Sequence, residues 1–487
     1  MKKTIFASLV ALTLSAPALA QSIAREGETA VEFTANSGDS VAAFQGSFQV
    51  PEFRADPESR MIELGYVRFP ATTQTPGSPI VYLAGGPGGS GTGTAEARRF
   101  PLFMAMRQHG DVIAFDQRGT GLSQTAPACR SSVNTPDDTV FDDSEIADAY
   151  RRMATECRVF WENTGADVRG YTTAESVSDL QALQSHLQAE RISLWSISYG
   201  SHLALAAINA MDDDLDRVII ASAEGLDQTV KLPARTDAYF ARVQAAVDSQ
   251  PEAAALYPDV AGLMRRVQAR LDNSPVHIDI PQQDGSTAPY LLQRRTVQEF
   301  SSRLISDPDN IGLLLAIYAS LDADDYRLTT ALLQRFHTPN EPISARMMPL
   351  AMDMASGISA ERLALFEAQV SASLIGGYLN FPMPQLLGVW DDIDLGDAFR
   401  VGPTGETPVL LFTGTLDGRT YPDAHVEAVA GLSDVTHVIV RNAGHNLFMV
   451  SDAVPEAMHQ FMRAEAVTAD EITIDLPDFS THPFAGR

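Results

Sequence analysis

Apolar residues along this chain follow two patterns, one typical of buried strands and the other of amphipathic helices. Short apolar or alternating runs bounded by Gly, Pro, Asn or Asp predict strands, at residues 31–33, 42–50, 61–69, 79–83, 111–116, 192–195, 217–221, 408–414 and 435–440. The first three favour an antiparallel opening to a sheet. A helical period at 178–190, directly before the strand at 192–195, gives the strand–helix alternation that predicts a mostly parallel sheet covered by helices.

Helical periodicity dominates between residues 228 and 397. Helices are expected at 235–249, 261–271, 297–305, 311–321, 326–336 and 360–372. This block interrupts an alternating α/β chain, and sheet character resumes after it. We therefore expect a core made of residues 21–227 and 398–487 with a helical cap, residues 228–397, inserted between them. An independent helical domain is the alternative, and 472–487 is expected to be an irregular or edge segment.

The first twenty residues have the three parts of a secretory signal peptide. Lys2 and Lys3 form a charged start, residues 5–14 an apolar centre, and Ala18-Leu19-Ala20 a small-residue cleavage site. No later apolar run reaches the ~20 residues that a membrane-spanning helix needs. We expect residues 1–20 to be removed and the mature protein to be periplasmic or secreted; an uncleaved anchor is the alternative.

Charge and cysteine content narrow the classes of partner and cofactor. The formal net charge is −27 at pH 7, which repels phosphate backbones and anionic membrane surfaces, so we expect no nucleic-acid or membrane partner. Cys129 and Cys157 are the two cysteines, and in an exported protein such a pair is expected to form one disulfide. Two cysteines cannot make a four-ligand zinc site by themselves, and the sequence has no H-E-x-x-H helix or Cys/His cluster, so no metal is expected. No motif implies a cofactor, and none is expected. No feature indicates an oligomeric state.

A small-residue turn joins the strand at 192–195 to an apolar helix that follows it. The turn reads Ser196-Ile197-Ser198-Tyr199-Gly200, and strand, serine-bearing turn and helix in this order are typical of the nucleophile elbow of an α/β-hydrolase fold. Gly200 fits the requirement for small residues around the serine, whereas Ser196 stands where the pattern has Gly. The alternative is a buried strand end whose hydroxyls are hydrogen-bonded. The pattern therefore makes Ser198 the candidate nucleophile.

Two further loops follow predicted strands near the start of the chain. Residues 84–91 (Ala-Gly-Gly-Pro-Gly-Gly-Ser-Gly) come after the strand at 79–83, and no Lys follows them as in a phosphate-binding loop. Glycines at this density let backbone N–H groups approach a ligand oxygen, which favours an oxyanion loop. In the next loop, we expect Asp116 and Arg118 to form a structural ion pair.

The resumed sheet supplies the other two groups that a serine hydrolase needs. Asp417 follows the strand at 408–414, and His445 follows the strand at 435–440, which gives the chain order serine, acid, histidine of this fold. His445 is predicted to take the proton of Ser198 and Asp417 to orient the imidazole. The oxyanion donors are predicted to be the N–H groups of Tyr199 and Gly86. Each residue alone is commonplace, but the joint arrangement favours catalysis.

Four motifs carry a resemblance to a known family. They are Gly85-Gly86-Pro87-Gly88-Gly89-Ser90-Gly91, Asp116-Gln117-Arg118-Gly119-Thr120-Gly121-Leu122-Ser123, Ser196-Ile197-Ser198-Tyr199-Gly200 and Gly444-His445. Together they resemble the prolyl aminopeptidase family, nearest its exported tripeptidyl-aminopeptidase-like branch, over about residues 45–460. The resemblance implies a serine peptidase that releases short pieces from free peptide N-termini under a helical cap. Ala84 stands where the family's glycine loop often begins with His.

An aminopeptidase has to hold a cationic α-amine, which calls for a carboxylate near the site. Glu224, after the strand at 217–221, is the candidate, with Asp353 in the cap as a further one; an ordinary loop acid is the alternative for Glu224. Three functions follow from the sequence. The first is an exopeptidase acting on peptides, the second an esterase or amidase acting on small acyl compounds, and the third a non-catalytic binding protein on the same scaffold.

Overall fold

A ten-stranded sheet forms the centre of the computed structural model, which describes residues 23–484. Its spatial order is β1-β2-β3-β5-β4-β7-β8-β12-β13-β14. The strands are β1 (Glu28–Thr34), β2 (Ser40–Pro51), β3 (Met61–Phe69), β4 (Ile80–Leu83), β5 (Val112–Phe115), β7 (Ile192–Ser198), β8 (Leu215–Ala223), β12 (Val409–Gly414), β13 (Val435–Arg441) and β14 (Glu471–Thr473). The predicted signal peptide, residues 1–20, lies outside the described residues.

The sheet is mostly parallel, as predicted. β1, β2 and β3 form an antiparallel opening, and β3 is also antiparallel to β5. All other neighbours are parallel, from β5 through β4, β7, β8, β12 and β13 to β14. The carboxyl ends of the parallel strands therefore meet at one edge, where β7, β12 and β13 deliver the loops of Ser198, Asp417 and His445.

Helices cover both faces of the sheet. One face packs against α2 (Phe100–Met106) and α16 (Ala453–Met462), and the other against α4 (Thr173–His186) and α5 (Tyr199–Met211). Alternate residues of each strand supply the two apolar clusters, as Leu194 and Trp195 do from β7. α4 begins earlier than its periodicity predicts because the Thr172 hydroxyl accepts a hydrogen bond from the Glu175 N–H and caps the helix.

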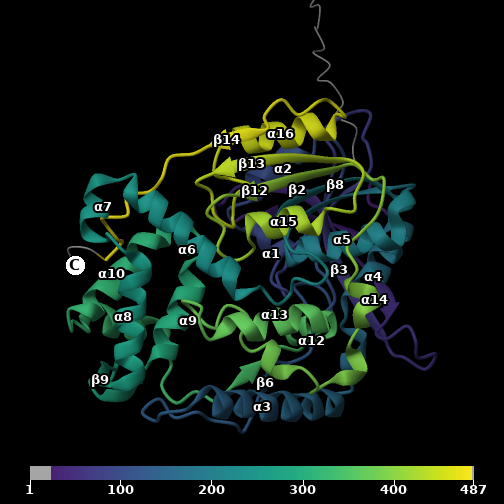
Figure 1. Cartoon of the computed structure of the whole chain (residues 1–487). Coiled ribbons are helices and arrows are strands. Elements are labelled where there is room, and N and C mark those ends of the chain that lie inside the picture. The colour runs from purple at the N-terminus through teal and green to yellow at the C-terminus, as the bar shows by residue number, and fades with distance from the viewer. Residues whose placement is uncertain (1–22, 485–487) are drawn as a thin grey trace, which may run out of the picture.

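A block of helices follows β8 and lies beside and below the sheet in Figure 1. It contains α6 (Pro233–Asp248), α7 (Pro251–Leu256), α8 (Val260–Asn273), α9 (Arg294–Leu304), α10 (Ile311–Asp322), α11 (Arg327–Phe336), α12 (Met347–Ser356), α13 (Ala360–Val370) and α14 (Gly396–Arg400). A hairpin of β9 (Val276–Pro281) and β10 (Thr287–Leu292) was not predicted. Helix α12 was not predicted either. Its residues are apolar or buried on almost every side, so the sequence shows no helical period there. The other short elements are α1 (Gly91–Glu96) and α15 (Pro422–Ala428).

The predicted ion pair between Asp116 and Arg118 is wrong. Asp116 instead accepts hydrogen bonds from the Ser90 hydroxyl (2.7 Å), from Thr92 and from the Leu122 N–H (2.8 Å). Arg118 is fully buried and binds both carboxylate oxygens of Asp179 on α4 at 2.7 Å. A bidentate partner satisfies the planar guanidinium better than a carboxylate two residues away along a turn. The loop that contains Asp116 and Arg118 is thus held in place by the hydrogen bonds of both residues.

Cys129 and Cys157 form a disulfide. It joins the short strand β6 (Cys129–Arg130) to α3 (Asp143–Asn163), and β6 pairs with β11 (Ser344–Ala345) just before α12. The disulfide therefore closes a loop within the segment after β5, and the pairing of β6 with β11 connects this segment to the helical block. None of the helices described between residues 23 and 484 is long and apolar enough to cross a bilayer.

Replacing both cysteines with serine is expected to lower the free energy of unfolding by ~3 kcal/mol, since the bond closes a loop with a sequence separation of 28 and restricts the unfolded chain. Urea unfolding of the wild type and of C129S/C157S would measure the difference. Wild-type protein kept reduced during refolding is the matched control and should behave like the variant. A difference below about 1 kcal/mol would contradict the expectation.

Candidate active site

Ser198 lies at the end of β7, where the chain turns sharply into α5. Its backbone has φ 57° and ψ −132°, a region that non-glycine residues rarely adopt. A Cβ on Gly200 would lie 2.2 Å from the Leu83 carbonyl oxygen, so this position accepts only glycine. Ser196 fits where the pattern has Gly because its hydroxyl donates to the Ile219 carbonyl at 3.0 Å. The local sequence thus holds the Ser198 hydroxyl at the edge of the sheet.

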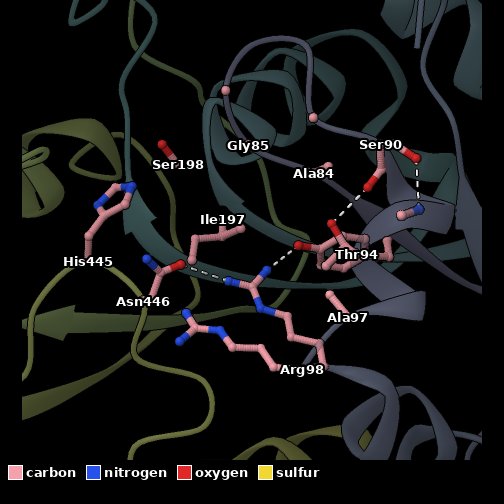
Figure 2. A pocket seen from close by; sticks show the side chains of 15 residues that line it. Ala84, Gly85, Ser90, Thr94, Ala97, Arg98, Ile197, Ser198, His445 and Asn446 are labelled. Carbon is pink, nitrogen blue, oxygen red and sulfur yellow. Dashed lines mark hydrogen bonds between the residues drawn. The ribbon is translucent and has the colours of Figure 1, made fainter. Parts of the chain in front are cut away.

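His445 and Asp417 form a hydrogen-bonded pair at the same edge. The Nδ1 atom of His445 lies 2.9 Å from Oδ2 and 3.1 Å from Oδ1 of Asp417. With Nδ1–H donated to the carboxylate, Nε2 is left to accept a proton. The His445 ring lies beside Ser198 (Figure 2), although among the described residues no hydrogen bond joins the two. Catalytic hydrogen bonds are often long or poorly aligned before substrate binds.

Asp417 is fully buried and is held in its ionised form. It accepts the backbone N–H groups of Arg419 (2.8 Å) and Thr420 (2.9 Å). Burial by itself would raise its pKa, but the charge and hydrogen bond of His445 and the other donors lower the pKa of Asp417 well below its usual range. The carboxylate can therefore orient the His445 ring and stabilise its positive charge.

Three residues that the sequence did not single out support this pair. The Thr420 hydroxyl donates to Asp417 at 3.0 Å and lies 2.9 Å from Nε2 of His425. Burial lowers the pKa of His425 to about 4, so its ring is neutral at pH 7. Ser222, also at positive φ (53°), donates its hydroxyl to the His445 carbonyl at 2.8 Å. The sequence features that could have identified these residues were the turn directly after Asp417 and a small residue near the end of β8.

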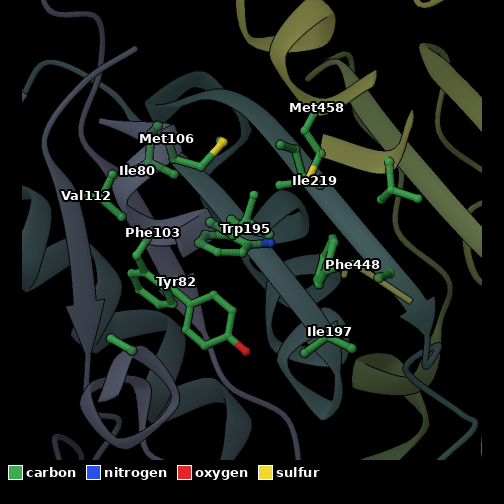
Figure 3. Close-up of a cluster of buried hydrophobic side chains, with 14 of the residues drawn as sticks. Ile80, Tyr82, Phe103, Met106, Val112, Trp195, Ile197, Ile219, Phe448 and Met458 are labelled. Atoms are coloured by element: carbon green, nitrogen blue, oxygen red, sulfur yellow. The ribbon is translucent and has the colours of Figure 1, made fainter. Parts of the chain in front are cut away.

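The strand that carries Ser198 rests on a buried aromatic cluster, drawn in Figure 3. The Trp195 ring lies 4.7 Å from the Tyr82 ring, 4.9 Å from that of Phe103 and 5.7 Å from that of Phe448, measured between centroids. Tilted and edge-on contacts of this kind pack large rings densely. The cluster therefore gives Ser198 a rigid support three residues along β7.

The glycine loop passes directly over Ser198. A Cβ on Gly85 would lie 3.0 Å from Cβ of Ser198, and Gly86 has a φ of +131°. Tyr199 is the first residue of α5, where a backbone N–H has no acceptor inside the helix. The predicted oxyanion donors thus lie on the two segments that flank the Ser198 hydroxyl. Ser90 caps α1 immediately after the loop by accepting from the Gly93 N–H at 2.8 Å.

Two pockets meet at Gly86. The first, about 460 Å³, is lined by Ser198, His445, Asn446 and residues of the glycine loop and α1. The second, about 310 Å³, is lined by Glu224 after β8, by Asp353 and other residues of the helical block, and by residues of α3 and of the loops after β4 and β12. We name them the serine pocket and the carboxylate pocket. Glu224 therefore lies next to the serine pocket and not in it.

The two carboxylates of the carboxylate pocket differ in their surroundings. Glu224 forms an ion pair with Lys231, whose Nζ lies 2.9 Å from its Oε2. Asp353, on α12, has no ion-pair partner among the residues that the structure describes. Burial, and then the charge of Glu224, raise the pKa of Asp353 to about 8. The pocket thus holds one compensated carboxylate and one that is protonated at neutral pH.

Asp353→Asn is expected to stabilise the protein at pH 8 and to have little effect at pH 4. Because the folded-state pKa of Asp353 lies above its ordinary value of 3.8, the folded protein binds the extra proton between about pH 4 and 8, and stability is lost as the pH rises through that window. Urea unfolding at pH 4, 6 and 8 should show a gain of at least about 1 kcal/mol at pH 8. Exposed Asp138→Asn is the control, and an equal gain at pH 4 and pH 8 would refute the linkage.

Most of the chain matches a known family. A family model described as the alpha/beta hydrolase fold matches residues 78–452, most of the chain. The chain therefore belongs to the alpha/beta hydrolase family and is a hydrolase with this fold.

Comparison with individual proteins gives partial matches. The tripeptidyl aminopeptidases of Streptomyces coelicolor and Streptomyces lividans are each 27% identical to this chain over 191 residues, which is 36% of this chain and 34% of each relative. The chain thus aligns with about a third of the length of these relatives. Among solved structures, Rv0554 from Mycobacterium tuberculosis matches 86% of this chain and 99% of its own, with 17% identity and a TM-score of 0.40.

Proposed function

We propose that Ser198, His445 and Asp417 act as a catalytic triad that hydrolyses an acyl bond through an acyl-enzyme. The Ser198 hydroxyl attacks the substrate carbonyl while Nε2 of His445 takes its proton. His445 then gives that proton to the leaving group, and water repeats the sequence to release the acyl part. The hydrogen bond between His445 and buried Asp417 is the observation that carries this proposal.

In this mechanism the tetrahedral oxyanion is held by backbone donors. The N–H of Tyr199 and that of Gly86 lie on the two segments that flank Ser198. Donors fixed in the ground state stabilise charge that develops only in the transition state, because they need no reorganisation. The proposal therefore assigns the oxyanion hole to Tyr199 and Gly86.

The substrate class that we propose is a peptide with a free N-terminus, from which a residue or short peptide is released. Support comes from the carboxylate pocket, which adjoins the serine pocket at Gly86 and contains Glu224 and Asp353. An α-ammonium group there would meet Glu224, in competition with Lys231, and would favour the ionised form of Asp353. The printed name of the Streptomyces relatives and the resemblance to prolyl aminopeptidases point in the same direction.

One observation favours a second candidate, an esterase or amidase acting on small acyl compounds. Lys231 already compensates the charge of Glu224, so the carboxylate pocket does not need a substrate amine to neutralise it. The chemistry at Ser198 would be the same. Whether a free amino group is required separates the two functions.

We also propose that the protein is exported and acts in the periplasm or outside the cell. The disulfide between Cys129 and Cys157 supports this, because such bonds persist in oxidising compartments. The amino-terminal sequence, with its charged start and small-residue cleavage site, supports it as well.

A panel of fluorogenic substrates tests the proposed function. It pairs amino-acid and tripeptide amides carrying free N-termini with the same compounds acetylated, and adds short-chain nitrophenyl esters. An aminopeptidase should cleave the free amides with kcat/KM at least ~10-fold above the acetylated ones, and Glu224→Gln should raise KM for the free amides. Exposed Glu96→Gln, on α1, is the matched control. Turnover of esters alone would assign the protein to the second candidate.

A further inference from the structure

Arg98 and Arg99 place positive charge in the serine pocket, where the proposed mechanism does not use it. Both line the pocket together with Ser198, His445 and Asn446, and no Asp or Glu is among its described lining residues. This contrasts with the chain as a whole, whose formal net charge is −27. Among its described lining residues, the serine pocket therefore has cationic side chains and no carboxylate, in a molecule whose net charge is negative.

Arg99 is an exception among the buried arginines. Five arginines are buried within residues 23–484, and four of them bind a carboxylate: Arg68 with Glu28, Arg118 with Asp179, Arg362 with Glu427 and Arg400 with Asp394. Arg99, 7% exposed, instead donates to the Tyr82 hydroxyl and, at 3.2 Å, to Oδ1 of Asn446, both neutral. The rings of Tyr82 and Phe448 lie 5.8 and 5.4 Å from its guanidinium carbon. A buried charge without a counter-ion is costly unless a ligand supplies one.

Arg98 supplies a second, accessible charge. It is exposed, and within the described part of the chain no ion pair or hydrogen bond engages its guanidinium. Figure 2 shows Arg98 reaching along the pocket below Asn446, on the side from which His445 projects. Its five N–H donors are therefore available to a planar anion such as a carboxylate.

The position of His445 decides which part of the substrate meets these arginines. In the proposed mechanism His445 gives a proton to the leaving group, so that group has to lie beside His445. His445 lines the serine pocket, and it is not among the described residues that line the carboxylate pocket. The acyl part, with its amine, thus points towards Glu224, and the leaving part towards Arg98 and Arg99.

We propose that Arg98 and Arg99 form a carboxylate-binding subsite for the leaving group, which makes short peptides with a free C-terminal carboxylate the preferred substrates. The inference rests on the proposed function for the direction of the substrate. Arg98 binds the anion directly, and buried Arg99 adds a fixed positive potential while it holds Asn446 next to His445. An acidic side chain near the start of the leaving group presents the same chemistry and is the other source of the carboxylate.

Kinetics with matched peptides test the subsite. Peptides whose leaving group has one, two or three residues are compared as C-terminal acids and as C-terminal amides, and a further amidated set carries Glu in the leaving group. We expect kcat/KM at low salt to be at least about 10-fold higher for the best acid than for its amide, with the ratio falling as salt is added. Preference only for amides carrying Glu would instead overturn the C-terminal assignment.

Variants of Arg98 test the subsite without disturbing the fold, because this arginine is exposed. Arg98→Gln should bring the acid-to-amide ratio close to one, and Arg98→Glu should reverse it. Arg152→Gln, an exposed arginine that lines a different pocket, is the control and should leave the ratio as in the wild type. An acid-to-amide ratio near one in the wild type, or one that Arg98→Gln does not change, overturns the proposal.

Binding to an inactive variant separates this proposal from the proposed function. Calorimetry with Ser198→Ala measures the affinity of a dipeptide acid and of its amide without turnover. Tighter binding of the acid that is lost in Ser198→Ala/Arg98→Gln supports the subsite even if no peptide is hydrolysed by the wild type. Equal binding of acid and amide rejects the subsite even if the fluorogenic panel establishes an aminopeptidase.

Discussion

Ser198→Ala is expected to lower kcat at least about 10⁴-fold on every substrate that the wild type hydrolyses, with the fold intact. The hydroxyl is the proposed nucleophile, and the other two serine hydroxyls at the elbow are hydrogen-bonded to backbone carbonyls. Ser196 donates to the Ile219 carbonyl, and Ser201 donates to the Ser198 carbonyl. Purified variant and wild type would be compared on the fluorogenic panel, with circular dichroism to verify folding.

Ser185→Ala provides the matched control, because Ser185 is an exposed serine on α4 and is not among the described residues that line the serine pocket or the carboxylate pocket. It should retain wild-type kcat within about threefold, the scatter expected of a peripheral contact. Residual activity of Ser198→Ala above one per cent would show that another group attacks the substrate. Equal inertness of wild type and variant on the whole panel would remove the basis for a triad.

Asp417→Asn is expected to lower kcat about 10⁴-fold with little change in KM. The amide still accepts from the backbone N–H groups of Arg419 and Thr420 but cannot stabilise a charged His445 ring, and it favours the wrong tautomer. Steady-state kinetics between pH 5 and 9 would measure the effect. The loss should shrink at high pH, where hydroxide replaces part of the general-base function.

A graded comparison identifies the origin of that loss. Thr420→Val removes one donor to Asp417 and leaves its charge, so we expect kcat to fall only about 3- to 10-fold. Double replacement of Asp417 and Ser198 should cost little more than Ser198→Ala alone, because residues that act as a unit are not additive. Fully additive losses would mean that Asp417 acts independently of Ser198.

Order along the chain and strand ends were enough to place Ser198, Asp417 and His445. Parallel strands end at one edge, so a serine, an acid and a histidine that each follow such a strand are expected to meet there. The helical block between β8 and β12 was predicted for a similar reason, because a change of period is visible in the sequence. These inferences depend only on the direction of strands and on periodicity.

Contacts between distant side chains could not be predicted in this way. Arg118 binds Asp179, which stands 61 residues away, and no local pattern favours it over nearby Asp116. Asp353 is on a helix that lacks an amphipathic period, so its place in the carboxylate pocket was only one option among the acids of the cap. That Arg99 pairs with no carboxylate among residues 23–484 depends on which side chains the fold brings near it.

The tryptophans give this protein a spectroscopic signal from two separate regions. Trp195 is in the aromatic cluster under the elbow, whereas Trp161 of α3 packs edge-on against Trp390, with 6.0 Å between the rings. All three are at most 3% exposed. In a Trp195→Phe variant, the emission would come from α3 and the segment before α14 alone. Comparing its unfolding curve with that of the wild type would show whether the sheet and the helical block lose structure together or one after the other.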